Sequence, residues 1–193
     1  MKKKFGMMAL AMILTAGMLA GCGSEQTAES SDGQDAVTGA ITVSAAASLT
    51  DVLNELAQTF QEEYPGTEVS FTFGGSGALQ TQIEEGAPVD LFFSAAESNM
   101  DALEEEGLID AATRKDVLQN EIVLIAPQGE TAVTPFETIL DSEPQIALGE
   151  AESVPAGKYA QEIFTNLGIW DDVKSHAVFA SNVREVLAWV EAG

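Results

Sequence analysis

The segment from Ile41 to Glu63 changes its hydrophobic period once, and this change constrains the fold more than any other feature of the chain. Residues 41–46 are β-branched and then small, which predicts a buried strand. Ser48 follows as the predicted N-cap of a helix, with Asp51 in a capping-box-like position. The helix is indicated by apolar residues at helical spacing, namely Leu49, Val52, Leu53, Leu56, Ala57 and Phe60. A strand that enters a helix through small residues leaves backbone N–H groups free, which outlines a site for a small anion.

Strands and helices alternate along the rest of the chain. Further strands are predicted over residues 68–73, 89–94, 121–127, 145–149 and 176–180, of which 121–127 looks the most buried. Helices are predicted over residues 78–85, 98–106, 135–141, 154–167 and 181–190, with a helical connector over 114–120. This alternation predicts an α/β protein with parallel-rich sheets covered by helices. Ligands of such sheets bind beyond the carboxyl ends of the strands.

The charge of the chain excludes several classes of partner. From Cys22 onward there are 31 acidic and five basic residues among 172. Such a body repels nucleic acid and anionic membrane surfaces, so we expect neither as a partner. Any anion that it binds must be held by local dipoles against the field of the whole protein. With 193 residues, the chain is long enough for one large or two small domains.

The first 39 residues are predicted to serve export and attachment. Residues 1–22 have the three parts of a secretory signal, which are lysines, an apolar run and small residues. Cys22 is the only cysteine, so an internal disulfide is excluded, and residues 19–22 resemble a bacterial lipobox. That resemblance implies cleavage before Cys22 and attachment of lipid to its sulfur; the alternative is an ordinary signal peptide with an incidental cysteine. Residues 23–39 are polar and predict a disordered tether.

Four strand-to-helix junctions share one chemistry. Each places small or capping residues at a helix N-terminus, and none has a basic side chain before its helix. Several such N-termini at one point would offer multiple N–H donors and fractional positive charge to an anion. A single junction can also be an ordinary capped helix or turn. The four junctions are Ala46-Ala47-Ser48, Gly75-Ser76-Gly77, Pro155-Ala156-Gly157 and Asn182-Val183.

An enzyme is the main alternative from a different functional class. Gly74-Gly75-Ser76-Gly77-Ala78 approximates the nucleophile elbow of the serine hydrolases, and His176 is the only histidine. The hypothesis of a nucleotide-binding protein has less support, because the third glycine of the dinucleotide fingerprint and a Gly-Lys-Ser/Thr sequence are both absent. No His and Cys cluster favours a metal site. Trp170 and Trp189 are interpreted as core or hinge residues rather than a sugar platform.

Several segments together resemble the molybdate-binding proteins of bacterial ABC importers. They are residues 41–50, 86–95, 154–160 and 182–184, and the likeness continues in order from about Ile41 to the end. The resemblance implies a two-lobed periplasmic-binding-protein fold of type II that closes on the anion, without a catalytic step. It implies that Ser48 and Ser76 each supply a hydroxyl and an amide, and that Ala156 and Val183 supply backbone amides. No cofactor and no free metal ion are expected, since the molybdenum is bound as its oxyanion.

The same resemblance sets expectations for domains and partners. We expect lobe 1 over residues 40–119 and lobe 2 over 120–193. The family has a fifth ligand, a tyrosine on the strand after the helix that starts at Val183, and a segment that returns to lobe 1. The sequence departs from the family here, so we expect a chain truncated at the C-terminus, and Tyr159 does not replace that tyrosine. The implied protein is a monomer, anchored by lipid on the outer face of the membrane, with a membrane permease as partner.

The choice of anion follows partly from chemistry. A site made only of donors prefers an anion without a proton, because a protonated oxygen would face a donor and stay unsatisfied. Molybdate, tungstate and sulfate meet this condition at neutral pH, whereas phosphate is partly protonated. The family resemblance favours molybdate or tungstate, and a receptor for another small oxyanion such as sulfate remains the alternative.

Overall fold

The computed structural model describes residues 37–129, 135–141 and 145–193, which belong to one compact unit. The predicted signal peptide, the lipidation site Cys22 and the predicted tether up to residue 36 lie outside the described residues. Within the described ranges, no helix is both long and apolar enough to cross a membrane. The first strand begins at Thr38, so its first two residues fall inside the segment predicted as a tether.

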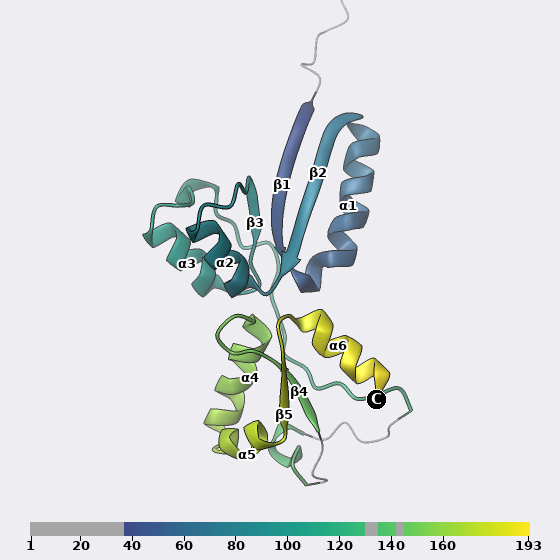
Figure 1. Cartoon of the computed structure of the whole chain (residues 1–193), viewed down its shortest axis with the longest axis vertical. Coiled ribbons are helices and arrows are strands. Elements are labelled where there is room, and N and C mark those ends of the chain that lie inside the picture. Colours follow the sequence, from purple (N-terminus) through teal and green to yellow (C-terminus); the bar gives the residue numbers. More distant parts are fainter. Residues whose placement is uncertain (1–36, 130–134, 142–144) are drawn as a thin grey trace, which may run out of the picture. The chain divides into compact units, whose positions relative to one another are not determined.

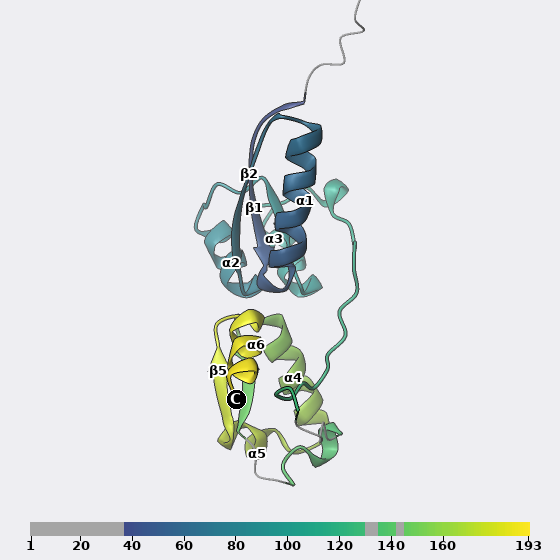
Figure 2. The same ribbon diagram turned by 90° about the vertical axis from the view of Figure 1, so that its right-hand side faces the viewer.

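Lobe 1 is built on a parallel three-stranded sheet with the order β2-β1-β3 (Figure 1). Its strands are β1 (Thr38–Ala46), β2 (Gly66–Gly74) and β3 (Leu91–Phe93). Its helices are α1 (Thr50–Glu63), α2 (Ser76–Glu84) and α3 (Glu97–Glu105). The chain moves from β1 to one edge and then back to the other edge, so right-handed crossovers place α1 and α2 on opposite faces of the sheet (Figure 2).

One buried cluster of lobe 1 lies between α1 and the sheet, and Leu79 of α2 is buried separately. Val43, Ala45 and Leu53 are buried in that cluster, and Phe71 and Phe73 stack at 5.1 Å between ring centroids beside them. The predicted helical stripe is only partly buried. Leu53 and Ala57 are covered, whereas the side chains of Val52 and Leu56 stay 54% and 59% exposed. The period of the stripe therefore identified the helix but overstated how much of its apolar face is covered.

Lobe 2 is built on two parallel strands, β4 (Ile146–Gly149) and β5 (Ala177–Ala180). Its helices are α4 (Pro155–Asn166), α5 (Trp170–Ser175) and α6 (Val183–Ala192), and Figure 1 shows α4 and α6 on either side of the strands. The core consists of Ile146, Leu148, Ala160, Phe164 and Val173. The prediction of a helix over 135–141 is wrong, because this segment contains only a single 3-10 turn, Phe136–Thr138.

The segment between the two lobes corrects two sequence predictions. Residues 114–120 form no helix, because a 3-10 turn (Ala111–Thr113) capped by Asp110 ends at Arg114 in an extended conformation. Residues 121–127 form no strand, although they looked the most buried. Val123 and Ile125 are 64% and 48% exposed, and no described residue pairs with this segment in a sheet. A continuous apolar run becomes a strand only where a neighbouring strand satisfies its backbone.

The register of each sheet brings its helix starts together. Ala46 lies level with Gly74, and Ala45 lies level with Phe93, so the three carboxyl ends of lobe 1 share one edge. In lobe 2, Gly149 lies level with Ala180 in the same way. The junctions after these strands are therefore positioned by the sheets rather than by their own sequences. Fold class and architecture agree with the predicted two-lobed α/β arrangement.

Candidate functional site

The four residues predicted to bind an anion line one cavity. Ser48 and Ser76 reach it from lobe 1, and Ala156 and Val183 reach it from lobe 2. The cavity has a volume of about 1040 Å³, which is far more than one tetrahedral anion needs. The junctions account for only part of its wall. The remainder is mostly apolar and comes mainly from residues 122–127, strand β4 and helices α4 and α6.

Three of the four residues present amides at the start of a helix. Ser76 is the first residue of α2, Val183 is the first of α6, and Ala156 is the second of α4, after Pro155. Amides in these positions have no acceptor within their own helix. No other described residue accepts a hydrogen bond from any of the three. The N-cap of α6 is Asn182, as predicted, and its side chain accepts from the Glu185 amide at 3.1 Å.

Ser48 corrects one local prediction. It does not cap a helix, because a 3-10 turn, η1 (Ala47–Leu49), separates β1 from α1. Helix α1 starts only at Thr50, whose hydroxyl donates to the Ala47 carbonyl at 2.7 Å. Ser48 is exposed, and its hydroxyl has no partner within the described part of the chain. It is therefore free to donate into the cavity that Ser48 lines.

The hydroxyl of Ser76 is held more firmly. The side chain is fully buried, and Oγ accepts a hydrogen bond from the Ala95 amide at 2.9 Å. The Ala95 carbonyl in turn accepts from Nδ2 of Asn120 at 2.6 Å. With one lone pair of Oγ occupied, the Ser76 proton remains available for an acceptor in the cavity. Ala95 and Asn120 also line the cavity, and sequence reasoning missed both because their contacts span 19 and 25 residues.

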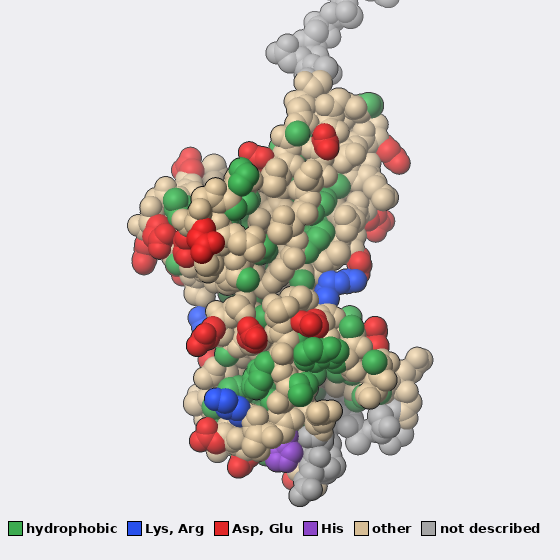
Figure 3. Space-filling model, in the orientation of Figure 1, with side chains coloured by type: hydrophobic (Ala, Val, Ile, Leu, Met, Phe, Trp, Pro, Cys, Tyr) green, Lys and Arg blue, Asp and Glu red, His purple; other side chains and the backbone are tan. Residues whose placement is uncertain are grey.

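Charged side chains contribute little to the cavity wall. Among the described residues that line it, Glu121 and Arg184 carry charge. The guanidinium of Arg184 donates to Asp51 at 2.7 Å, so its charge is already balanced. Figure 3 shows acidic side chains scattered over the visible face of the molecule, with few basic ones. An anion in this cavity would therefore depend on oriented amides and hydroxyls.

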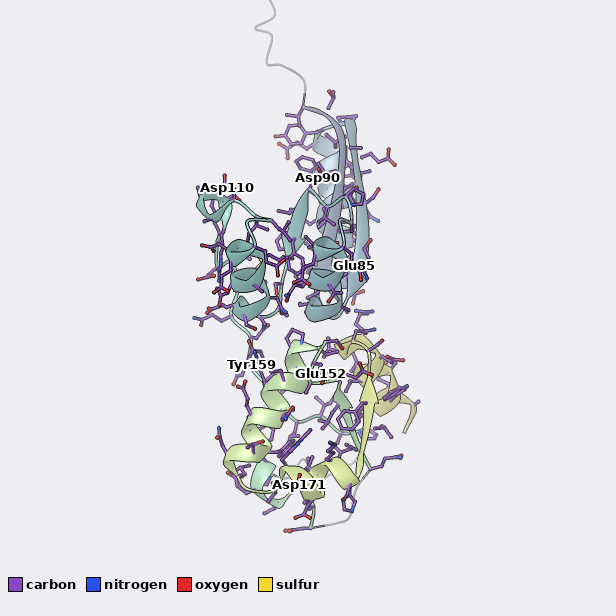
Figure 4. The ribbon with its side chains drawn as sticks, turned by 60° about the vertical axis from the view of Figure 1, so that its left-hand side comes forward. Glu85, Asp90, Asp110, Glu152, Tyr159 and Asp171 are labelled. Atoms are coloured by element: carbon purple, nitrogen blue, oxygen red, sulfur yellow. The ribbon has the colours of Figure 1, made fainter. Side chains whose placement is uncertain are left out.

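Tyr159 is a further polar group in the cavity wall. It projects from α4, as Figure 4 shows. Glu152, which is also labelled there, lies in the turn that precedes this helix. Burial raises the pKa of the Tyr159 phenol, and the carboxylates of Glu162 and Glu97 raise it further. The phenol therefore remains protonated at neutral pH and can donate a hydrogen bond. Sequence reasoning assigned this tyrosine no role.

The arrangement does not form a hydrolase dyad. Ser76 lies beyond the carboxyl end of β2, whereas His176 precedes β5 and is absent from the cavity wall. The Nδ1 atom of His176 instead lies 2.9 Å from the Asp172 carbonyl and 3.0 Å from the Ser175 hydroxyl. Among the described residues, no base therefore lies beside the Ser76 hydroxyl. The enzyme alternative built on this pair is therefore wrong. No group of three metal-ligating side chains occurs among the described residues either.

The sequence is similar to those of known solute-binding proteins. A family model described as bacterial extracellular solute-binding protein matches residues 41–193. YvgL of Bacillus subtilis, named as an ABC transporter substrate-binding lipoprotein, is 44% identical over 177 residues, which is 91% of this chain and 66% of that protein. The molybdate-binding protein ModA of Haemophilus influenzae is 39% identical over 164 residues, which is 81% of this chain and 63% of that protein.

A solved structure shows the same fold. The substrate-binding domain from Clostridium difficile that is named for a molybdenum ABC transporter has a TM-score of 0.57 and 43% identity, over 80% of this chain and 67% of that one. The chain spans slightly less than two thirds of the length of the curated relatives given above. The family consists of solute-binding proteins, not enzymes, which confirms that expectation. The chain belongs to the bacterial extracellular solute-binding protein family.

Proposed function

We propose that the chain is the substrate-binding component of an ABC importer, that it captures molybdate or tungstate, and that it delivers the anion to a membrane permease. The observation that carries this proposal is that Ser48, Ser76, Ala156 and Val183 line one cavity, with amides and hydroxyls free to donate. The names of the relatives, ModA among them, support the choice of ligand. The predicted boundary between the lobes, after Gln119, stays part of the proposal.

The donor set explains how a strongly acidic protein could hold a dianion. Each helix N-terminus contributes about 0.3–1 kcal/mol at an exposed site and up to about 2 kcal/mol when partly buried. Hydrogen bonds to a charged acceptor are about twice as strong as neutral ones. Several of both reach the roughly 8 kcal/mol that micromolar binding requires. Each lobe supplies two of the four donor residues, so binding would draw the lobes together.

Attachment to the membrane is a separate part of the proposal. We place a lipid on Cys22 and the folded part on the outer face of the membrane, as a monomer. The name of YvgL, which includes lipoprotein, supports this. A Cys22→Ser variant expressed in a bacterial host is expected to leave the membrane fraction, and an unchanged distribution would contradict lipid attachment.

Isothermal titration calorimetry tests the ligand directly. Molybdate, tungstate, sulfate and phosphate are titrated into the purified chain at one ionic strength. We expect the tightest binding for molybdate and tungstate and the weakest for phosphate, whose proton would face a donor. Comparable affinity for all four anions would contradict the proposal. Tight binding of sulfate alone would assign the chain to the alternative oxyanion receptor.

Two serine variants test the location of the site. Ser48→Ala and Ser76→Ala are each expected to weaken binding by about 1–3 kcal/mol, because an anion oxygen in the site loses its donor. Ser70→Ala is a matched control, since Ser70 is an exposed residue of β2 that does not line the cavity. Unchanged affinity in both site variants would place the binding site elsewhere.

A further inference from the structure

Two glycines flank Ser76, and the backbone conformation requires neither of them to be glycine. Gly75 has φ −66° and ψ 135°, which any residue adopts. Gly77 is the second residue of α2 and is not among the glycines with positive φ. In a helix, alanine is more favourable than glycine, so local structure alone favours a different residue at position 77. The reason for both glycines must lie in their surroundings.

Those surroundings belong to the other lobe. A Cβ atom added to Gly75 would lie 2.6 Å from the Ser153 carbonyl oxygen and 2.9 Å from the Ser181 carbonyl oxygen. A Cβ atom added to Gly77 would lie 3.0 Å from the Cα atom of Ser153 and 3.1 Å from the Glu152 carbonyl oxygen. These neighbours are backbone atoms, which cannot rotate away as the end of a flexible side chain can. The Gly77 amide also donates to the Ser153 carbonyl at 3.0 Å.

We propose that Gly75 and Gly77 are positioning residues for the anion site: they lack side chains so that its two halves can approach. This inference rests on the proposed function, because it assigns the approach a role in binding. Ser153 precedes the junction at Ala156 by three residues, and Ser181 precedes Val183 by two. The contact of the two glycines with these residues thus sets how close the Ser76 donors come to the amides of lobe 2. A methyl group at either position would hold the halves apart while leaving each lobe folded.

The test uses Gly75→Ala and Gly77→Ala, with Gly66→Ala as the matched control. An added Cβ at Gly66 would meet the Thr38 side chain, within lobe 1. Calorimetry with molybdate measures affinity, and thermal denaturation measures stability. We expect the affinity of both site variants to fall at least tenfold while their melting temperature stays level or rises. Gly66→Ala is expected to keep its affinity. A purely structural role would lower the melting temperature instead.

A second measurement does not depend on the ligand. The Lys158 ammonium donates to the Ser98 hydroxyl of the other lobe at 3.2 Å, so Ser98→Cys and Lys158→Cys report the approach of the lobes. In a Cys22→Ser background, a short bifunctional thiol reagent should cross-link this pair. Adding Gly75→Ala or Gly77→Ala is expected to lower the yield several-fold, and adding Gly66→Ala is expected to leave it unchanged.

The outcomes separate the inference from the proposed function. If the unsubstituted chain fails to bind molybdate, the proposed function is wrong, and the cross-linking yield alone decides the role of the glycines. If the chain binds molybdate and the glycine variants match it in affinity and cross-linking, the inference is overturned. Unfolding of Gly75→Ala or Gly77→Ala would also overturn it, because the glycines would then serve the fold of lobe 1.

Discussion

The two lobes use the same succession of strand and helix but complete it differently. In lobe 1, β1 lies between β2 and β3, so the central strand is paired on both edges. In lobe 2, β4 pairs with β5 alone among the described residues. Apolar side chains are exposed in both lobes, for example Val52 and Leu56 of α1 in lobe 1 and Leu187 and Trp189 of α6 in lobe 2. Helix starts can therefore be positioned alike in two lobes whose sheets differ in the number of paired strands.

The largest expected effects come from the two cores and test whether the lobes are separate folding units. Phe164→Ala in lobe 2 should cost about 3–5 kcal/mol, and Leu79→Ala in lobe 1 about 2–5 kcal/mol, because both side chains are almost fully buried. Hydrogen exchange localises the loss. We expect Phe164→Ala to accelerate exchange of the β4 and β5 amides more than that of the β1 and β2 amides. Equal acceleration of amide exchange in both lobes would show that they do not unfold as separate units.

The second effect compares two serines within lobe 1. Ser76→Ala should lower the free energy of unfolding by about 1–3 kcal/mol, since the Ala95 amide loses its acceptor in a partly buried place. Ser48→Ala should leave stability nearly unchanged, because the Ser48 hydroxyl is exposed and has no partner among the described residues. Urea denaturation of both variants measures this difference. Equal loss in the two variants would show that the Ala95 contact does not stabilise the fold.

A smaller effect concerns the ion pair that joins the lobes. Asp51→Asn and Arg184→Ala should each weaken anion binding by at most about 1 kcal/mol, because the side chains of Arg184 and Asp51 are 42% and 81% exposed to solvent. Salt should reduce the difference further. A double-mutant cycle on calorimetric affinities measures the coupling. A coupling well above this range would mean that a charged contact, rather than the close backbone approach, holds the lobes together.

The smallest effect tests the corrected segment 121–127. Val123→Ser should change the free energy of unfolding by no more than about 0.5 kcal/mol, because the side chain of Val123 is 64% exposed. Val43→Ser, in the buried centre of lobe 1, serves as the contrasting variant. Thermal denaturation of the two proteins provides the comparison. A large loss for Val123→Ser would restore the sequence-based prediction of a buried strand.

Local signals in the sequence predicted most of the elements and the location of the junctions. Three helix starts depend on signals within a few residues, and the sequence alone is enough to predict them. These signals are the change of period after residue 46, Pro155 at the start of α4 and Asn182 before α6. They were sufficient to identify four positions that line one cavity. Whether these positions bind an anion stays a prediction.

Contacts that depend on distant residues could not be predicted in this way. Ser48 does not act as the predicted N-cap, because a 3-10 turn that contacts the distant helix α6 lies between β1 and α1. Residues 121–127 have the pattern of a strand but no strand beside them in the described structure. The link from Ser76 through Ala95 to Asn120 also depends on packing, because its hydrogen bonds join residues far apart in the sequence.

The amides proposed as donors at Ala156 and Val183 have an evolutionary consequence. Every amino acid except proline carries a main-chain N–H, so exchanging either side chain alters the surroundings of a guest without removing the donor. Related chains could thus diverge at both positions and still offer identical contacts. In such relatives, the positions at which the helices begin would be conserved, whereas the amino acids at positions 156 and 183 would vary.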